Sequence, residues 1–306
     1  MPSFIQRLTT AVQTKRNGVL VGLDPRYESL PPALQTAAAG DYAGRAAAFG
    51  TFCRSVIDVV APLVPIVKPQ AAFFEELGPA GMVVLCDVIQ YARTRGLLVL
   101  VDGKRNDIGT TGAAYAAGYL GIDGQSPWGA DSMTVNPYMG SDSLEPFVQR
   151  SVETGSGIFV LVKTSNPGGA QFQDLVCDGK PLYRHVADYV EQLALQTIDT
   201  ETSNGGAYGA VGAVVGATYP AQLAELRAAM PHTWFLVPGY GAQGGAAADV
   251  APAFDANGLG AVVNNSRGII FAHARKEYAK FGAARWQEAV EAATRQMMSE
   301  LPPVRG

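Results

Sequence analysis

Cysteine is scarce in this sequence, and its few copies are not arranged for cross-linking or for metal. The 306 residues include three cysteines, Cys53, Cys86 and Cys177, which are odd in number and far apart. The paired spacings of a disulfide framework or a zinc site are absent. We therefore expect no structural disulfide and no bound metal, and we place the protein in a reducing compartment.

Long runs of one residue type are also missing. No stretch is rich in lysine and arginine, and the net charge is −4, which argues against nucleic acid as a partner. The apolar runs never reach the roughly 18 residues that a membrane span needs. Residues 1–8 have an amphipathic, helical pattern rather than that of a signal peptide. We expect a soluble, cytoplasmic protein that does not act on a membrane.

Short apolar runs, many of them β-branched, recur along the chain between Gly, Pro, Asn and Asp. Because their residues do not alternate with polar ones, they are typical of parallel strands buried on both faces. The predicted strands are Val19–Pro25, Pro65–Gln70, Leu97–Lys104, Ser132–Pro137, Gly157–Thr164, Gly209–Ala217, Thr233–Gly241 and Leu259–Asn264. The predicted helices are Asp41–Ala61, Gly78–Arg95, Thr110–Leu120, Ser143–Glu153, Leu182–Thr197, Pro220–Met230, Gln243–Phe254 and Ile269–Met298.

Eight alternations of strand and helix predict an α/β protein with a single (β/α)8 barrel and an extra N-terminal helix. A doubly wound sheet usually stops nearer six strands and carries G-x-G-x-x-G after the first, which is absent here. We find no linker, so we predict one domain over residues 1–306. Residues 204–207 are expected to form a surface loop, and residues from about 299 a flexible tail.

The densest charge cluster follows the third predicted strand. Asp102, Lys104 and Asp107 fall within six positions, directly after an apolar run. Carboxylates crowded around one ammonium are costly unless chemistry uses them, so the cluster indicates a functional site. A lone D-x-K motif would more simply be solvated charge at a strand end.

Polar residues also end most of the other predicted strands, and barrel enzymes build their active sites at the carboxyl ends of strands. Asp24 before Pro25 equally fits a turn, whereas Lys68 ends a buried strand and needs a partner. Across seven of the eight strands, these polar ends include Asp24, Lys68, Asp102, Asn136, Lys163–Gly168, Gly239–Gly245 and Asn264–Gly268. Their convergence predicts an active site.

The residues that follow the seventh and eighth predicted strands are typical of a phosphate-binding site. Glycines in Gly239–Gly245 let backbone N–H groups approach an anion. A helix beginning near Arg267 would point its positive end at the same place, where barrels commonly bind phosphate. The planar guanidinium of Arg267 can bind two phosphate oxygens.

Together these residues resemble the orotidine 5′-phosphate decarboxylase family, in its larger bacterial subfamily. The family signature D-x-K-x-x-D-I-x-x-T is unbroken, and the likeness covers most of the chain in the same order. In this sequence the signature residues are Asp102, Lys104, Asp107, Ile108 and Thr111. Elsewhere in the chain the resemblance extends to Asp24, Lys68, Ser165-x-Pro167-Gly168, Gln243 within its glycine loop, and Arg267. Thr200–Tyr208 also matches the longer subfamily.

The resemblance implies decarboxylation of orotidine 5′-monophosphate to UMP, in pyrimidine biosynthesis, without a cofactor. Loss of CO2 leaves a carbanion-like C6 that only protein electrostatics can stabilise. Lys104 would protonate C6, within a charged network that includes Asp102, Asp107 and Lys68.

The resemblance also assigns the binding residues. Lys68 and Asp24 would hold the ribose hydroxyls, and Ser165 the pyrimidine amide edge. The remaining contacts would come from Ile108 in the apolar part of the pocket and from Gln243, Gly244 and Arg267 at the phosphate. Asp107 and Thr111 would reach into the neighbouring subunit's site, which implies a homodimer. The roles of Asn136, Tyr115, Tyr138 and Tyr240 stay open.

Three other functions remain to be distinguished. A Mg²⁺-dependent sugar-phosphate aldolase or decarboxylase of the same superfamily would need a carboxylate on strand two, where Lys68 would repel the metal. A Schiff-base aldolase would need Lys104 as a neutral amine, which nearby carboxylates disfavour. A non-catalytic nucleotide-phosphate-binding barrel would not need charge packed beside the pyrimidine. Chelation and borohydride trapping separate the first two from a cofactor-free decarboxylase.

Overall fold

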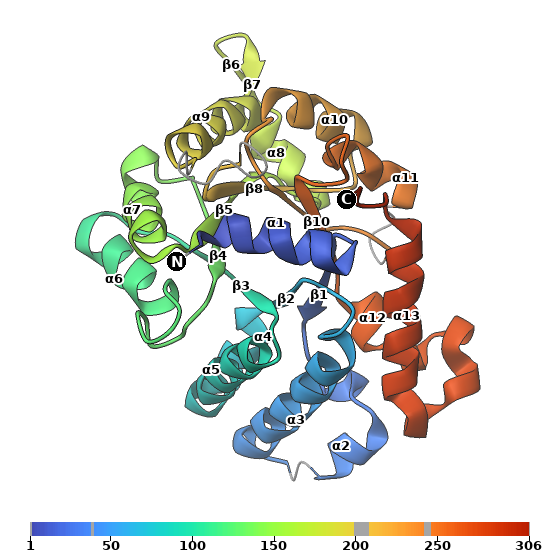
Figure 1. Ribbon diagram of the computed structural model, residues 1–306. Coiled ribbons are helices and arrows are strands. Elements are labelled where there is room, and N and C mark those ends of the chain that lie inside the picture. The colour runs from blue at the N-terminus through green and yellow to red at the C-terminus, as the bar shows by residue number, and fades with distance from the viewer. Residues whose placement is uncertain (1, 38–39, 199–207, 242–245, 306) are drawn as a thin grey trace.

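A closed barrel of parallel strands forms the centre of the molecule (Figure 1). The computed structural model describes residues 2–37, 40–198, 208–241 and 246–305. The barrel strands are β1 (Val19–Leu23), β2 (Ile66–Pro69), β3 (Leu98–Arg105), β4 (Ser132–Val135), β5 (Gly157–Lys163), β8 (Val211–Val215), β9 (Phe235–Val237) and β10 (Ala261–Asn265). They pair in the order β1-β10-β9-β8-β5-β4-β3-β2, and β1 closes on β2. The predicted (β/α)8 barrel is confirmed.

Helices surround the barrel in Figure 1. Those that match predicted segments are α3 (Tyr42–Val60), α5 (Gly78–Thr94), α6 (Gly109–Tyr119), α7 (Glu145–Thr154), α9 (Leu182–Gln196) and α10 (Pro220–Ala229). Short elements that the sequence did not suggest are α2 (Pro32–Ala37), α4 (Ala71–Glu75), α8 (Ala170–Gln173) and the antiparallel hairpin of β6 (Val176–Cys177) and β7 (Lys180–Pro181).

Two predicted helices are shorter than expected. The segment Ile269–Met298 is broken into α12 (Arg267–Ile270), several 3-10 turns over residues 272–285, and α13 (Trp286–Glu300). The chain folds back because the rings of Phe271 and Trp286 both pack against Phe52 of α3. The segment Gln243–Phe254 contains only α11 (Ala247–Val250) and a 3-10 turn, and residues 242–245 lie outside the described residues.

The extra N-terminal helix, α1 (Phe4–Lys15), lies across the barrel in Figure 1. Ser3 and Gln6 form a capping box at its start, which satisfies free amide groups of the first turn. Phe4, Leu8 and other α1 residues join the cluster of side chains that fills the barrel interior, where Phe4 packs edge-on against Phe159. The interior is therefore filled from this end, and the carboxyl ends of the strands are left to form a site.

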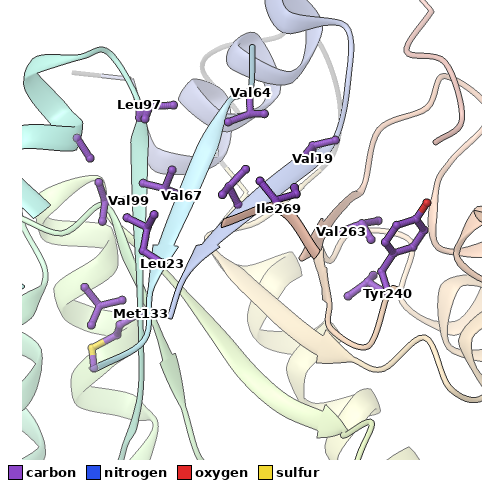
Figure 2. Close-up of a cluster of buried hydrophobic side chains, with 14 of the residues drawn as sticks. Val19, Leu23, Val64, Val67, Leu97, Val99, Met133, Tyr240, Val263 and Ile269 are labelled. Carbon is purple, nitrogen blue, oxygen red and sulfur yellow. The ribbon is translucent and has the colours of Figure 1, made fainter. Parts of the chain in front are cut away.

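Successive strand residues point to opposite sides of the barrel wall. Leu20 of β1 belongs to the interior cluster, whereas Val19 and Val21 belong to the layer between barrel and helices. Figure 2 shows part of this outer layer, including Val19, Val67 and Val263. Burial on both faces explains why the strand sequences are apolar without alternation.

The C-terminal residues pack against the body of the protein, which does not fit the flexible tail predicted from about residue 299. The helix α13 continues to Glu300, and Leu301 is buried. The Arg305 backbone N–H donates to the Asn257 carbonyl at 2.9 Å. The predicted loop at residues 204–207 lies outside the described residues. No described helix is long and apolar enough to span a membrane.

Candidate active site

A cavity of about 260 Å³ lies at the carboxyl ends of the barrel strands. Five residues predicted from the sequence line it: Asp24, Lys68, Asp102, Lys104 and Ser165. A second cavity of about 170 Å³ is lined by Arg26, Tyr240 and Arg267. Both cavities also share Asp24, Pro238 and Asn264, so they adjoin. The arrangement offers a charged chamber at one end and an arginine-lined chamber at the other.

Asp102 is the centre of the charged chamber. Its Oδ1 accepts hydrogen bonds from Lys104 Nζ at 2.6 Å and from Thr134 Oγ1 at 2.9 Å. Its Oδ2 accepts from Lys68 Nζ at 2.8 Å and from Gln70 Nε2 at 2.9 Å. A single carboxylate thus binds two ammonium groups, and four donors fix its orientation.

Charge pairing keeps this buried network ionised. Burial alone would raise the pKa of Asp102, but the ammonium groups of Lys68 and Lys104 outweigh it and hold that pKa well below its usual range. Burial would likewise lower the pKa of Lys68, but Asp102 and Asp24 raise it above its ordinary value. The chamber therefore holds Asp102 as an anion and Lys68 as a cation.

The two lysines differ in access to the cavity. The Lys68 side chain is 5% exposed and also lies 3.9 Å from Asp24 Oδ1, whereas the Lys104 side chain is 46% exposed. Lys104 has a left-handed backbone, φ +47°, at a register shift between β3 and β4, and its N–H donates to Thr134 Oγ1. This irregular strand end places a half-exposed ammonium beside a buried one.

Arg267 lies at the start of α12 and faces the smaller cavity. The Oδ1 atom of Asn265 accepts from the Gly268 N–H at 3.2 Å, which fixes the turn that carries Arg267. Arg26 adds a second guanidinium to the lining and packs over the Phe73 ring. Gln243 and Gly244, predicted to bind here, lie outside the described residues.

Asp107, Ile108 and Thr111 do not line either cavity of their own chain. Asp107 Oδ1 accepts from the Ile108 N–H at 2.8 Å, and Ile108 is 50% exposed. Ile108 lies in an open groove of about 830 Å³ between α6 and α7. This half of the signature motif therefore does not contribute to the lining of the chamber that Asp102 and Lys104 occupy.

Two of the polar strand ends turn away from the cavity, contrary to the convergence predicted from the sequence. Lys163 is buried, pairs with Asp174, and lies over the Tyr183 and Tyr219 rings on the outer side of β5. Asn136 Oδ1 accepts from the Tyr138 N–H at 3.0 Å in a local turn. Neither residue lines either cavity.

The polar lining residues that the sequence analysis did not name include Arg26, Gln70 and Thr134, and Asn264 was named there only as a polar strand end. Gln70 directly follows β2, so a polar residue at a strand end was an available signal. Thr134 lies inside β4, and its direction depends on register with Asp102. Of the three tyrosines left open, Tyr240 lines the smaller cavity with its hydroxyl on Glu300, while Tyr115 and Tyr138 are exposed.

Comparisons with known proteins find similarity to one family over most of the chain. Residues 19–281 match the family described as orotidine 5′-phosphate decarboxylase / HUMPS. An orotidine 5′-phosphate decarboxylase of Rhodopirellula baltica is 55% identical over 98% of this chain and 99% of its own. One from Deinococcus radiodurans is 44% identical over 89% and 90%. The structure of Leishmania donovani OMP decarboxylase superposes with a TM-score of 0.74 at 33% identity, covering 97% of this chain and 96% of that one.

Proposed function

Since the chain belongs to the orotidine 5′-phosphate decarboxylase / HUMPS family, we propose that it converts orotidine 5′-monophosphate to UMP and CO2 without a cofactor. The observation that carries this proposal is the Lys68–Asp102–Lys104 network in one cavity and Arg267 in the lining of the adjoining cavity. The first supplies charge at a reacting carbon, and the second binds a phosphate.

The reaction breaks the bond between C6 and the carboxylate carbon, and the electron pair stays on C6. Asp102, held as an anion, would lie near the substrate carboxylate and repel it until CO2 leaves. Lys104 would then stabilise the negative C6 and transfer its proton there, forming the C6–H bond. Two unit charges 4 Å apart interact by about 4 kcal/mol at an effective dielectric of about 20, or about three decades of rate.

The difference in exposure supports separate roles for the two lysines. Lys68 is enclosed between Asp102 and Asp24, so it serves as a fixed countercharge and reaches the ribose. Lys104 has one carboxylate partner and faces the cavity, so it is the ammonium free to approach C6. Both ammonium groups keep Asp102 ionised until Lys104 gives up its proton, after which Lys68 continues to do so.

Binding energy from the phosphate supports the chemistry at C6. Arg267, with Gln243 and Gly244, would hold the phosphate and so fix the pyrimidine in the charged chamber. Ser165 would read the pyrimidine amide edge from the segment after β5. The free energy gained by binding the phosphate, which does not react, would in this way lower the barrier to the reaction at C6.

A metal-dependent reaction fits this site poorly. The position on β2 that would have to offer Mg²⁺ a carboxylate is Lys68, and its ammonium already binds Asp102. In the described part of the chain, no three His, Cys, Asp or Glu side chains are grouped so as to hold a metal ion. The donor set favours a cofactor-free decarboxylase over the aldolase chemistry of the same superfamily.

Purified protein is expected to convert orotidine 5′-monophosphate to UMP at the same rate with and without EDTA, because the charged groups come from the chain itself. The measurement is the fall in substrate absorbance, with UMP identified by chromatography. Loss of the rate on chelation, restored by Mg²⁺, would favour the aldolase-type alternative. Binding of nucleotide without turnover would favour the non-catalytic barrel.

We propose further that the protein is a cytoplasmic homodimer of single-domain subunits, with Asp107 and Thr111 completing the partner subunit's site. Asp107 and Ile108 do not line their own chamber, and Ile108 lies in the open groove beside α6. Exposed apolar side chains nearby include Tyr138 and Met139, which follow β4. A second copy covering this face would bury them and bring Asp107 to a neighbouring chamber.

Mixing two inactive variants tests the shared site. Lys104→Ala and Asp107→Ala homodimers are each expected to be inactive, but a heterodimer would contain one site with both residues intact. Random exchange of equal amounts should restore about one quarter of the wild-type activity by simple counting of sites in a twofold dimer. Exchange is followed by mass spectrometry of tagged subunits. Heterodimers that form without regaining activity would show that Asp107 acts within its own subunit.

A further inference from the structure

Asn264, the fourth residue of β10, points into the barrel. Val262 belongs to the interior cluster and Val263 to the outer layer, so alternation directs Asn264 inward. It pairs in register with Leu20 of β1, another interior residue. The Asn264 side chain lines both cavities, so it stands at the junction of the charged chamber and the arginine-lined chamber.

The amide of Asn264 is buried but poorly paired. Its Oδ1 atom has no hydrogen-bond partner among the described residues, and its Nδ2 reaches Ser266 Oγ only at 3.4 Å. Asp24 Oδ1, at the end of the adjacent strand β1, is also buried without a hydrogen bond. A buried acceptor left without a donor costs about 1–3 kcal/mol. The Lys68 ammonium lies 3.9 Å from Asp24 Oδ1, too far for a hydrogen bond, so the unpaired Asn264 Oδ1 is the stronger indication of a ligand that donates.

The neighbouring strand leaves room for this amide. A Cβ atom on Gly22 would lie 1.8 Å from Ser266 Oγ and 2.9 Å from Asn264 Oδ1. Any side chain at position 22 would therefore displace both polar groups from the cavity wall. Gly22 on β1 therefore makes the space that the inward-pointing amide of Asn264 on β10 occupies.

We propose that Asn264 binds the sugar of the nucleotide, with Oδ1 accepting a hydrogen bond from a ribose hydroxyl. This assignment rests on the proposed function, which puts the pyrimidine beside Lys104 and the phosphate beside Arg267. The sugar must then lie at the wall that the two cavities share, formed by Asp24, Pro238 and Asn264. Phosphate oxygens are acceptors and the pyrimidine N–H is placed beside Ser165, so at this wall a ribose hydroxyl is the substrate group that can donate to Oδ1.

A hydrogen bond between Asn264 and the sugar would make binding selective between nucleotides. Asn264 is a specificity-determining residue that favours ribonucleotides over nucleotides lacking the hydroxyl it binds. Removing one hydrogen bond of this kind is expected to weaken binding about three- to tenfold. The loss should appear only with ligands that carry the hydroxyl.

The test measures the Kd of UMP, 2′-deoxy-UMP and 3′-deoxy-UMP by calorimetry for wild type and Asn264→Ala. We expect Asn264→Ala to weaken UMP and one deoxy analogue by about three- to tenfold, and to leave unchanged the analogue that lacks the bound hydroxyl. Arg267→Ala is the comparison, because loss of a phosphate contact weakens all three ligands by the same factor. Asn257→Ala, in an exposed turn, is the control for substitution of an asparagine.

The outcomes separate the two proposals. If wild type turns over orotidine 5′-monophosphate but Asn264→Ala weakens all three ligands equally, or none, the ribose assignment is overturned and the decarboxylase function stands. If wild type neither binds UMP nor turns over the substrate, the proposed function fails, and the ribose assignment fails with it. Thermal unfolding of each variant shows that Asn264→Ala keeps the fold.

Discussion

The Lys104→Ala variant is expected to lose turnover by about five decades, combining about three decades of charge stabilisation with at least about two from proton transfer. The loss falls on kcat, because the group acts on charge that develops only as CO2 leaves. UMP should still bind, since Arg267 and the ribose contacts are untouched.

The fold should survive this change. The Lys104 side chain is 46% exposed, and Asp102 keeps its hydrogen bonds from Lys68, Gln70 and Thr134. The readouts are kcat from absorbance and the thermal unfolding midpoint. Lys180→Ala is the matched control, because Lys180 is half-exposed and pairs with one carboxylate, Asp188, far along the chain from the signature motif. Near-normal turnover by Lys104→Ala would remove it from the proton-transfer role.

The Asp102→Asn variant is expected to lose both activity and stability. Lys68 and Lys104 bind this carboxylate at 2.8 and 2.6 Å, and Lys68 is buried. Breaking a buried ion pair and leaving one charge behind costs about 3–5 kcal/mol; because Asp24 lies near Lys68, we expect the lower end, about 3 kcal/mol. We expect kcat to fall by about three decades through loss of the fixed negative charge.

The pH dependence of stability distinguishes this role from simple packing. Because the folded-state pKa of Asp102 is lowered, its contribution to stability is present above the unfolded-state pKa of about 3.9 and is lost as the pH falls further. Urea unfolding of wild type and Asp102→Asn should therefore differ most at neutral pH and converge below about pH 4. A constant difference between the two proteins at every pH would mean that the carboxylate charge is not what stabilises the chamber.

Local sequence patterns predicted the barrel and the identity of its charged motif. The eight apolar runs became the eight strands of one closed sheet, because runs of this length are buried wherever they pair. Asp102, Lys104, Lys68 and Asp24 followed from strand-end position, since all carboxyl ends of a parallel barrel share one face. The break in the helix after β10 escaped prediction, because it depends on Phe271 and Trp286 meeting Phe52.

The set of strands and the charged residues at their ends could be predicted from local sequence, since both depend on residues adjacent in the chain. Which side chains meet depends instead on how the strands pair in the folded barrel. Closing the barrel set the register that brings Gln70 and Thr134 to Asp102, turned Lys163 outward, and left Asn264 facing the cavity. A shift of one position along a strand reverses the side to which a residue points, and pairing across the barrel fixes that choice.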